Sequence, residues 1–347
     1  MMDATKRLFF GRALRSDRLE HTLLPKTVAL PVFASDAVSS NAYATQEILV
    51  TLALGGYALY SFGPWVAAAV VVIFFVVVAS YRQNVHAYPS GGGDYEVVST
   101  NLGPRWGVFV ASALLVDYVM TVAVSISSAV ANLGSTFPII ERHAPWWAVG
   151  FVVLITLINL RGIRESGLAF AIPTYAFMLT MAAMIITGVV RSLGGAEMQA
   201  ESAAWQIAPE ASYAGLALAF LIARAFSSGT TALTGIEAIS DSVAAFRPVE
   251  WRNARRVLTV MVILLATMFG GISALAHHTG IVYTENGPTL LYQLGNLIFG
   301  NGVLLAVLQL ATLMILLLAA NTAFADFPRL AAFLAQDGYL PRQLASL

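Results

Sequence analysis

The sequence predicts an all-α integral membrane protein with eight spanning helices, on three observations. First, 58% of the 347 residues are hydrophobic and 11% are charged, whereas a soluble domain carries about 25% charged residues. Second, eight stretches approach the ~20 apolar residues that a helix needs to cross a ~30 Å hydrocarbon core. Third, the positive charges gather in alternate connecting segments, as in multi-pass proteins. The predicted spans are residues 28–53, 63–81, 105–133, 145–160, 168–190, 213–240, 257–276 and 301–325.

The distribution of Lys and Arg predicts which side of the cell membrane each end occupies. Sixteen of the 19 basic residues lie in segments that share a side with the N-terminus, and two, Arg142 and Arg191, lie on the other side. Because cytoplasmic segments retain positive charge, we expect a cytoplasmic N-terminus. The expected organisation is a cytoplasmic segment 1–27, five spans within 28–190 with a re-entrant segment at 82–104, an extracellular loop 191–212, three spans within 213–325, and a cytoplasmic segment 326–347.

The composition excludes several classes of function. Lys plus Arg equals Asp plus Glu at 19 each, so nothing favours a nucleic-acid partner. The chain has no cysteine, which rules out disulfides, thiolate metal sites and cysteine nucleophiles. The glycine-rich segment at 88–96 lacks the preceding strand and the lysine of a phosphate-binding loop, so it predicts a break between helices. We expect no cofactor.

Polar residues interrupt the first span near its middle. Their hydroxyl, amide and carboxyl side chains favour local side-chain-to-backbone hydrogen bonds, and the run reads Ser35-Asp36-Ala-Val-Ser39-Ser40-Asn41-Ala-Tyr43. We therefore expect this helix to be unwound. Unwound backbone at membrane depth occurs around a cavity, and its carbonyl groups are free to bind ions.

The sixth span repeats this pattern in the second half of the chain. It reads Ser227-Ser228-Gly229-Thr230-Thr231-Ala-Leu-Thr234-Gly235-Ile-Glu237. An interrupted span in each half of a chain indicates a transporter binding site. The alternative interpretation of each span is close helix packing through small residues.

Three carboxylates, those of Asp36, Asp117 and Glu237, fall deep in apolar runs. Each costs about 2.5–3.5 kcal/mol on insertion, so such a group faces a wet cavity or makes a structural hydrogen bond or ion pair. Arg224 is the one basic residue within a predicted span, and we expect it to pair with one of these acids; the alternative is a local charge that discourages a second bound cation.

Hydroxyl groups accompany the three acids at helical spacing. Asp117, Thr121 and Ser125 recur every four residues and share one helix face, with Tyr118 beside them, and Thr230 and Thr234 precede Glu237 in the same way. A shell of oxygen atoms alone suits a hard cation. The pattern therefore predicts an alkali cation site, at which protons exchange with the cation on the same carboxylates.

Five motifs along the chain are shared with one group of transporters. They are the first-span run from Ser35 to Tyr43, Tyr88-Pro-Ser-Gly-Gly-Gly, Leu115-Val-Asp117-Tyr118, the run from Ser227 to Glu237, and Asn321-Thr-Ala-Phe-Ala-Asp326-Phe-Pro-Arg329. In these motifs the sequence resembles the amino acid–polyamine–organocation (APC) superfamily, and within it the KimA-type potassium importers related to the Kup family. The resemblance covers essentially the whole chain.

The resemblance implies a LeuT-type fold, in which helices 1–5 and 6–10 form inverted repeats and helices 1 and 6 are broken around the substrate. It implies proton-coupled potassium import, with Asp36, Asp117 and Glu237 as proton-coupling candidates. The implied ion path, together with Thr230 from the spacing argument, is Asp36, Tyr43, Asp117, Tyr118, Thr121, Ser125, Thr230, Thr234 and Glu237. Eight spans would lack the last helices of this fold, so we expect a chain that stops after the eighth helix.

Other functions fit the same features less well. An amino-acid permease has the same fold, but Asp36 would repel a substrate carboxylate where that class offers glycine N–H groups. An intramembrane aspartyl protease would need a Gly-x-Gly-Asp motif that no span contains, so we expect no enzyme. A sensor that binds without transport is a third alternative. The expected partners are a small inorganic cation or an amino acid and the lipid bilayer, and a homodimer is left open.

Overall fold

The structure, a computed structural model, describes residues 26–89, 91, 93–160, 167–284 and 287–345. Within these ranges the chain forms helices and no strand, as the sequence predicts. The α-helices are α2 (Lys26–Ser39), α3 (Ala44–Ala53), α4 (Gly63–Ala87), α5 (Gly93–Leu102), α6 (Pro104–Thr136), α7 (Pro138–Arg142), α8 (Ala144–Leu160), α9 (Gly167–Leu193), α10 (Leu216–Gly229), α11 (Ala238–Asp241), α12 (Glu250–His278), α13 (Leu290–Phe299) and α14 (Val303–Gln336). Short 3-10 turns are η2 (Ser40–Ala42), η3 (Tyr57–Phe62), η4 (Glu201–Ala204), η5 (Thr230–Leu233), η6 (Val243–Ala245) and η7 (Arg342–Ala345).

Six helical segments of the described chain are long and apolar enough to cross a membrane. They run Tyr57–Ala87, Pro104–Thr136, Phe170–Leu193, Leu216–Asp241, Glu250–His278 and Val303–Gln336. The other two predicted spans appear as shorter pieces, because α8 has 17 residues and the first span is divided into α2 with 14 residues and α3 with 10. The chain is thus a multi-pass membrane protein.

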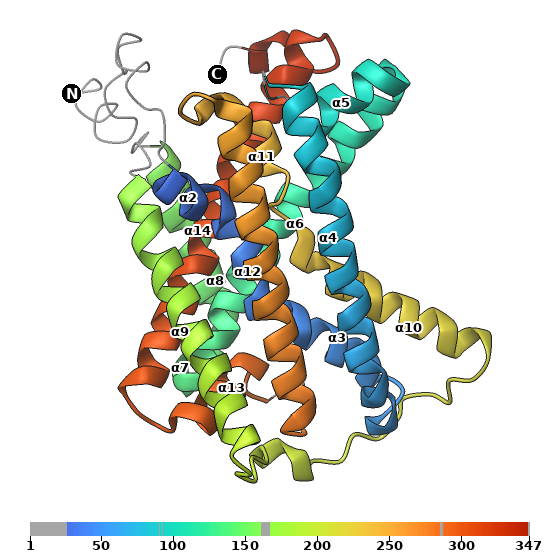
Figure 1. The fold of residues 1–347 in the computed structure, drawn as a ribbon, viewed down its shortest axis with the longest axis vertical. Coiled ribbons are helices and arrows are strands. Elements are labelled where there is room, and N and C mark those ends of the chain that lie inside the picture. Colours follow the sequence, from blue (N-terminus) through green and yellow to red (C-terminus); the bar gives the residue numbers. More distant parts are fainter. Residues whose placement is uncertain (1–25, 90, 92, 161–166, 285–286, 346–347) are drawn as a thin grey trace.

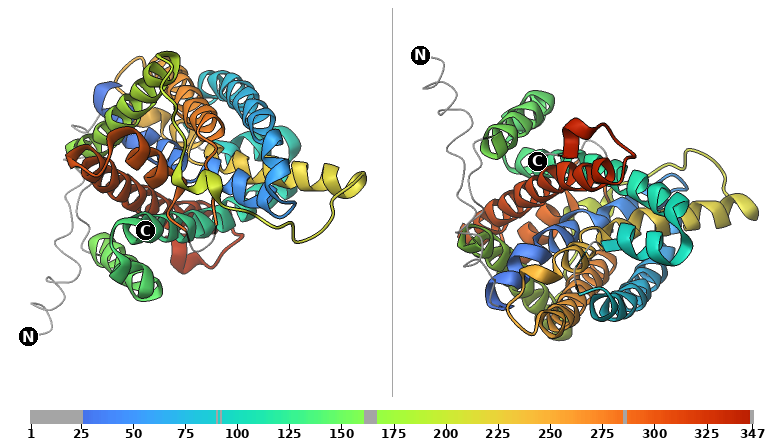
Figure 2. Two further views of the ribbon diagram at one scale, coloured as in Figure 1. Left: turned by 90° about the horizontal axis from the view of Figure 1, so that it is seen from below. Right: turned by 90° about the horizontal axis from the view of Figure 1, so that it is seen from above.

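The long helices run side by side between two ends of the bundle (Figure 1). We call the upper end in Figure 1 the α5 end, because α5 and α11 lie there, and the lower end the α13 end, where α7 and α13 lie. The helix α10 leans outward from the bundle, which is visible in both views of Figure 2. Its outer part exposes Leu216 and Phe220.

The core is formed by α4, α9, α12 and α14 around the broken first span. Buried residues of α2, α3, α4 and α12 form one hydrophobic cluster, within which the rings of Phe74 and Phe269 meet edge to face at 5.6 Å. Both α6 and α9 pack on α14, and α2 lies against α9 and α14. The broken first span is therefore enclosed by long helices at the centre of the molecule.

Several predicted boundaries differ from the structure. Residues 82–87 continue α4, so the break expected at 82–104 begins at Tyr88, and most of the remainder is the separate helix α5. The helix α14 continues to Gln336, so the first part of the segment expected at 326–347 is helical. The last turns of α4 are polar, so a boundary drawn from hydropathy places its end too early. In α14 the polar residues Asp326 and Arg329 interrupt the apolar run, but the helix continues through them into a second apolar stretch. The predictions for residues 1–25, Arg161 and Arg164 lie outside the described residues.

Candidate ion-binding site

The first span is broken where the sequence predicts. The helix α2 ends at Ser39, the turn η2 follows, and Tyr43 has φ −133° and ψ −24° before α3 begins. The Ser39 and Ser40 hydroxyls donate to the carbonyl groups of Asp36 and Ala37, each at 2.6 Å, and Asn41 Nδ2 donates to the Val38 carbonyl at 3.1 Å. These bonds compete with helical hydrogen bonding, which is why the helix stops here.

The sixth span is broken by the same chemistry. The hydroxyls of Thr230, Thr231 and Thr234 donate to the carbonyl groups three residues earlier, at 2.7, 2.7 and 2.9 Å. The helix α10 gives way to η5, and Gly235 follows with φ +83°. The span resumes as α11 with only four residues.

The two breaks meet at the centre of the bundle. The turns η2 and η5 are in contact. A Cβ atom on Gly235 would lie 2.7 Å from the Cβ of Asp36 and 2.8 Å from the backbone nitrogen of Ala37. A glycine is therefore required at this point, both for its backbone conformation and for the closeness of α2.

The three predicted acids lie close enough to interact electrostatically with one another. Asp36 interacts with Asp117, and Glu237 interacts with both. Tyr43 lies near Asp36 and Asp117, with its hydroxyl beside the Thr234 side chain. No ion pair neutralises any of the three acids within the described ranges. Unpaired carboxylates at membrane depth are expensive, which makes this cluster a functional-site candidate.

The helix α6, which carries Asp117, also carries two buried hydroxyls and a buried tyrosine. Thr121 and Ser125 are 6% and 1% exposed, and Tyr118 is 8% exposed. The Ser125 hydroxyl and the Oδ1 atom of Asn41 are buried and have no hydrogen-bond partner among the residues that the structure describes. Leaving such a group unsatisfied costs about 1–3 kcal/mol. Asn41 was not among the predicted site residues, although it stands inside the polar run of the first span.

The carboxylates alone do not enclose a metal ion. No group of three or more His, Asp or Glu side chains in the described part of the chain is arranged to chelate a metal. A cation bound in this region would therefore need hydroxyl, amide and carbonyl oxygens in addition to carboxylates. Such neutral oxygen ligands suit hard cations.

Further acids, missed by the sequence reasoning, line a cavity of about 250 Å³ at the α5 end. They are Asp94, Asp241 and Asp326, and Tyr118 and Arg329 also line the cavity. Asp326 interacts with Asp36, and Tyr118 interacts with Glu237 and Asp117, so the cavity adjoins the three predicted acids. Asp326 stands inside one of the shared motifs and Asp94 directly follows another, which is the signal that could have found them. Asp241 carries no sequence signal of this kind.

The glycine-rich segment has a packing role at this cavity. Gly91 and Gly93 have φ +85° and +57°. A Cβ atom on Gly93 would overlap the Asp241 carboxylate, and one on Gly91 would lie 2.5 Å from the Asp241 carbonyl oxygen. Both glycines thus make room for the end of α11. Ser90 and Gly92 of the same motif lie outside the described residues.

The expectation for Arg224 was wrong. This residue is exposed on α10, and none of the described acids lies within ion-pair distance of it. The helix α10 leans outward from the bundle (Figure 1), and Arg224 lies on its exposed face.

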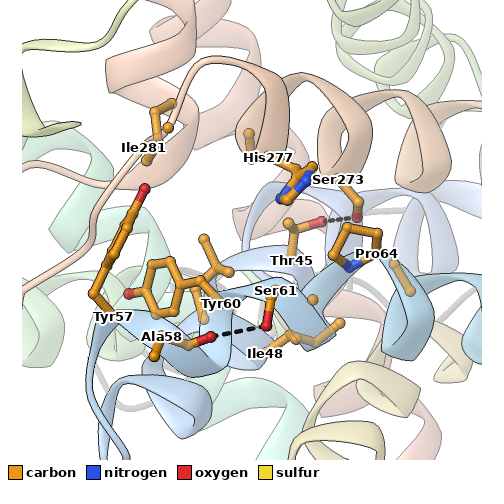
Figure 3. A pocket seen from close by; sticks show the side chains of 15 residues that line it. Thr45, Ile48, Tyr57, Ala58, Tyr60, Ser61, Pro64, Ser273, His277 and Ile281 are labelled. Atoms are coloured by element: carbon orange, nitrogen blue, oxygen red, sulfur yellow. Dashed lines mark hydrogen bonds between the residues drawn. The ribbon is translucent and has the colours of Figure 1, made fainter. Parts of the chain in front are cut away.

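A separate cavity of about 210 Å³ lies at the α13 end, between α3, η3 and the last turns of α12 (Figure 3). The hydroxyls of Thr45 and Ser273 lie 2.9 Å apart in this cavity, and the rings of Tyr57 and Tyr60 line its other side. None of the nine predicted ion-site residues lines it. The predicted site and this cavity are therefore distinct.

A membrane-embedded bundle with two helix breaks and unpaired acids between them defines a transporter. Residues 30–347 match the family model described as amino acid permease, and the chain belongs to this family. It is a family of transporters, so the expectation that the chain is no enzyme is confirmed.

Two curated proteins are similar to this chain. The potassium transporter KimA of Bacillus subtilis (strain 168) is 40% identical over 342 residues, which cover 99% of this chain and 56% of that protein. An amino-acid permease of Schizosaccharomyces pombe (strain 972 / ATCC 24843), named as uncharacterized, is 27% identical over 126 residues, which cover 36% of this chain and 21% of that protein. The chain thus spans little more than half the length of the first relative. The resemblance to the APC superfamily and to KimA-type proteins is confirmed.

Proposed function

We propose that this chain takes part in proton-coupled import of potassium ions across the cell membrane. The observation that carries the proposal is the set of unpaired acids, Asp36, Asp117 and Glu237, beside two helix breaks. The similarity to a protein named as a potassium transporter supports the choice of ion. The proposed fold is the LeuT type, with α2 and α3 as the broken first helix and α10, η5 and α11 as the broken sixth.

The proposed ion path uses oxygen atoms in place of the water shell of the ion. Ser125 and Asn41 supply buried oxygens without a partner among the described residues, and Tyr43 and Thr234 supply hydroxyls near the acids. The proposed path adds the hydroxyls of Thr121 and Thr230. An alkali cation accepts such mixed oxygen ligands because it has no strict geometric demand. Tyr118 lies where this region opens into the cavity at the α5 end.

Proton coupling follows from the charge of the cluster. Three carboxylates close together repel one another and require compensating positive charge. A bound cation supplies that charge in one step of the cycle, and protons supply it when the cation has left. The protein groups that exchange the two are Asp36, Asp117 and Glu237.

The proposed topology places the N-terminus and the α5 end in the cytoplasm, as the positive charges predict. It can be tested directly because the chain contains no cysteine. Single cysteines in place of Arg255 on α12 and Arg142 on α7 would be probed in whole cells with a membrane-impermeant thiol reagent. Labelling at position 142 without labelling at 255 is expected, and the reverse pattern would overturn the orientation.

The transport proposal is tested by uptake of rubidium into a host that lacks potassium uptake. We expect the chain to support rubidium accumulation and growth at low potassium, and a pH gradient, acid outside, to increase the rate. An absence of rubidium uptake by a chain that is inserted in the membrane would contradict the proposal.

The second candidate function is proton-coupled amino-acid transport on the same fold. The family description and the S. pombe relative favour it. The carboxylate of Asp36, placed beside the break of the first span, argues against it, because it would repel the carboxylate of an amino acid. Uptake of labelled amino acids, measured in the same cells as rubidium uptake, separates the two functions.

A further inference from the structure

The cavity at the α5 end already contains a positively charged group. Arg329 and Asp326 both line it, and Arg329 Nη1 donates to Asp326 Oδ1 at 2.8 Å. No other ion pair is found among the residues that the structure describes. The Arg329 side chain is 67% exposed and that of Asp326 is 26% exposed. A pair this accessible to water is weak and exchanges readily.

The cavity carries more negative than positive charge. Asp94 and Asp241 line it in addition to the ion pair, and Asp241 interacts with both Asp94 and Asp326. One guanidinium thus faces three carboxylates. A cavity whose lining carries an excess of one sign of charge concentrates ions of the opposite sign.

An independent feature indicates that a ligand enters this cavity. The Tyr118 side chain is 8% exposed and lines the cavity, and its hydroxyl forms no hydrogen bond with a described residue. Tyr118 also lies next to Asp117 and Glu237. Its hydroxyl therefore stands between the three predicted acids and the cavity, with a free oxygen for a passing ion.

We propose that Arg329 is a tethered cation that competes with a monovalent inorganic cation for Asp326 and so lowers the cation affinity of this cavity. The described acids do not chelate a metal, so the cavity holds its cation through charge and not through a closed ligand shell. Placed on the path between the three acids and the α5 end, Arg329 would speed the release of the cation. This role of Arg329 in release rests on the proposed function, whereas the competition at Asp326 does not.

The experiment measures how rubidium chloride raises the thermal midpoint of the purified chain, with choline chloride maintaining the ionic strength. In Arg329→Gln, the rubidium concentration for half-maximal stabilisation is expected to fall by about three- to tenfold, the effect of one charge across a water-filled cavity. Arg255→Gln is the control, because Arg255 is exposed on α12 and does not line the cavity. It is expected to match the wild type.

The double variant Asp326→Asn, Arg329→Gln restores the charge balance of the cavity and is expected to return to the wild-type rubidium dependence. A merely structural role for Arg329 would not produce this rescue. If Arg329→Gln matches Arg255→Gln, or if the double variant keeps the tighter binding, the inference is overturned. If Arg329→Gln binds rubidium more tightly but the protein transports no cation, the proposed function is overturned, whereas the competition between Arg329 and the cation stands. In a transporting protein, Arg329→Gln should lower both KM and maximal uptake.

Discussion

The contact between the two helix breaks predicts a large cost for Gly235→Ala. Gly235 has φ +83°, and the left-handed backbone costs a residue with a Cβ atom roughly 1–2 kcal/mol. The new Cβ would lie 2.7 Å from the Cβ of Asp36, and such overpacking typically costs about 1–3 kcal/mol. We therefore expect the free energy of unfolding to fall by about 2–5 kcal/mol.

The matched control for this variant is Gly270→Ala. Gly270 lies inside α12, and a Cβ atom there would meet nothing within 4 Å. Alanine in a helix interior is favoured over glycine by roughly 0.5–1 kcal/mol. Thermal unfolding of both purified variants measures the difference, and rubidium uptake in cells measures its consequence. Equal thermal midpoints for the two variants would refute the close approach of Gly235 to α2.

Three further predictions concern single acids and hydroxyls. Asp117→Asn should abolish cation uptake while membrane insertion, measured by immunoblot of the membrane fraction, is retained; undiminished uptake would remove Asp117 from the mechanism. Ser125→Ala should reduce uptake but raise the thermal midpoint in the absence of potassium. The variant removes a buried hydroxyl that has no partner among the described residues, and such a group costs about 1–3 kcal/mol. A lower midpoint would show that the Ser125 hydroxyl makes a hydrogen bond in the folded protein. Burial raises the pKa of Asp94, against the opposing effect of the Tyr81 hydrogen bond. The protonated Asp94 side chain therefore stabilises the fold fully below its unfolded pKa of roughly 3.9, and this stabilisation is lost as pH rises through the folded pKa. Between pH 4 and 8, the thermal midpoint should consequently fall more steeply for the wild type than for Asp94→Asn.

The sequence predicts local features of this protein well, because each has a local cause. The breaks at 40–43 and 230–235 follow from runs of Ser, Thr, Asn and Gly whose side chains bond to the nearest carbonyl groups. The six long apolar segments follow from hydropathy. In these cases the residues that determine the structure lie within one or two helical turns of the feature itself.

Contacts between distant segments could not be predicted in the same way. Gly93 and Asp241 touch although they lie far apart in the chain, and no periodicity in either segment indicates the other. The same is true of Gly235 and Asp36. The error over Arg224 has a related cause, since a pattern within one span does not reveal that α10 leans outward from the bundle. Long arginine side chains also reach the membrane surface along apolar helices, so position in a span does not imply an ion pair.

The close packing of Gly91 and Gly93 against Asp241 couples the movements of two helices. The end of α11 fits into the segment that begins α5, and neither can shift alone without opening this contact. If the sixth span tilts during a transport cycle, α5 and α11 must therefore move together as one rigid body. Spin labels on α5 and α11 should therefore hold one separation whether or not potassium is present, while the separation between α11 and α9 changes.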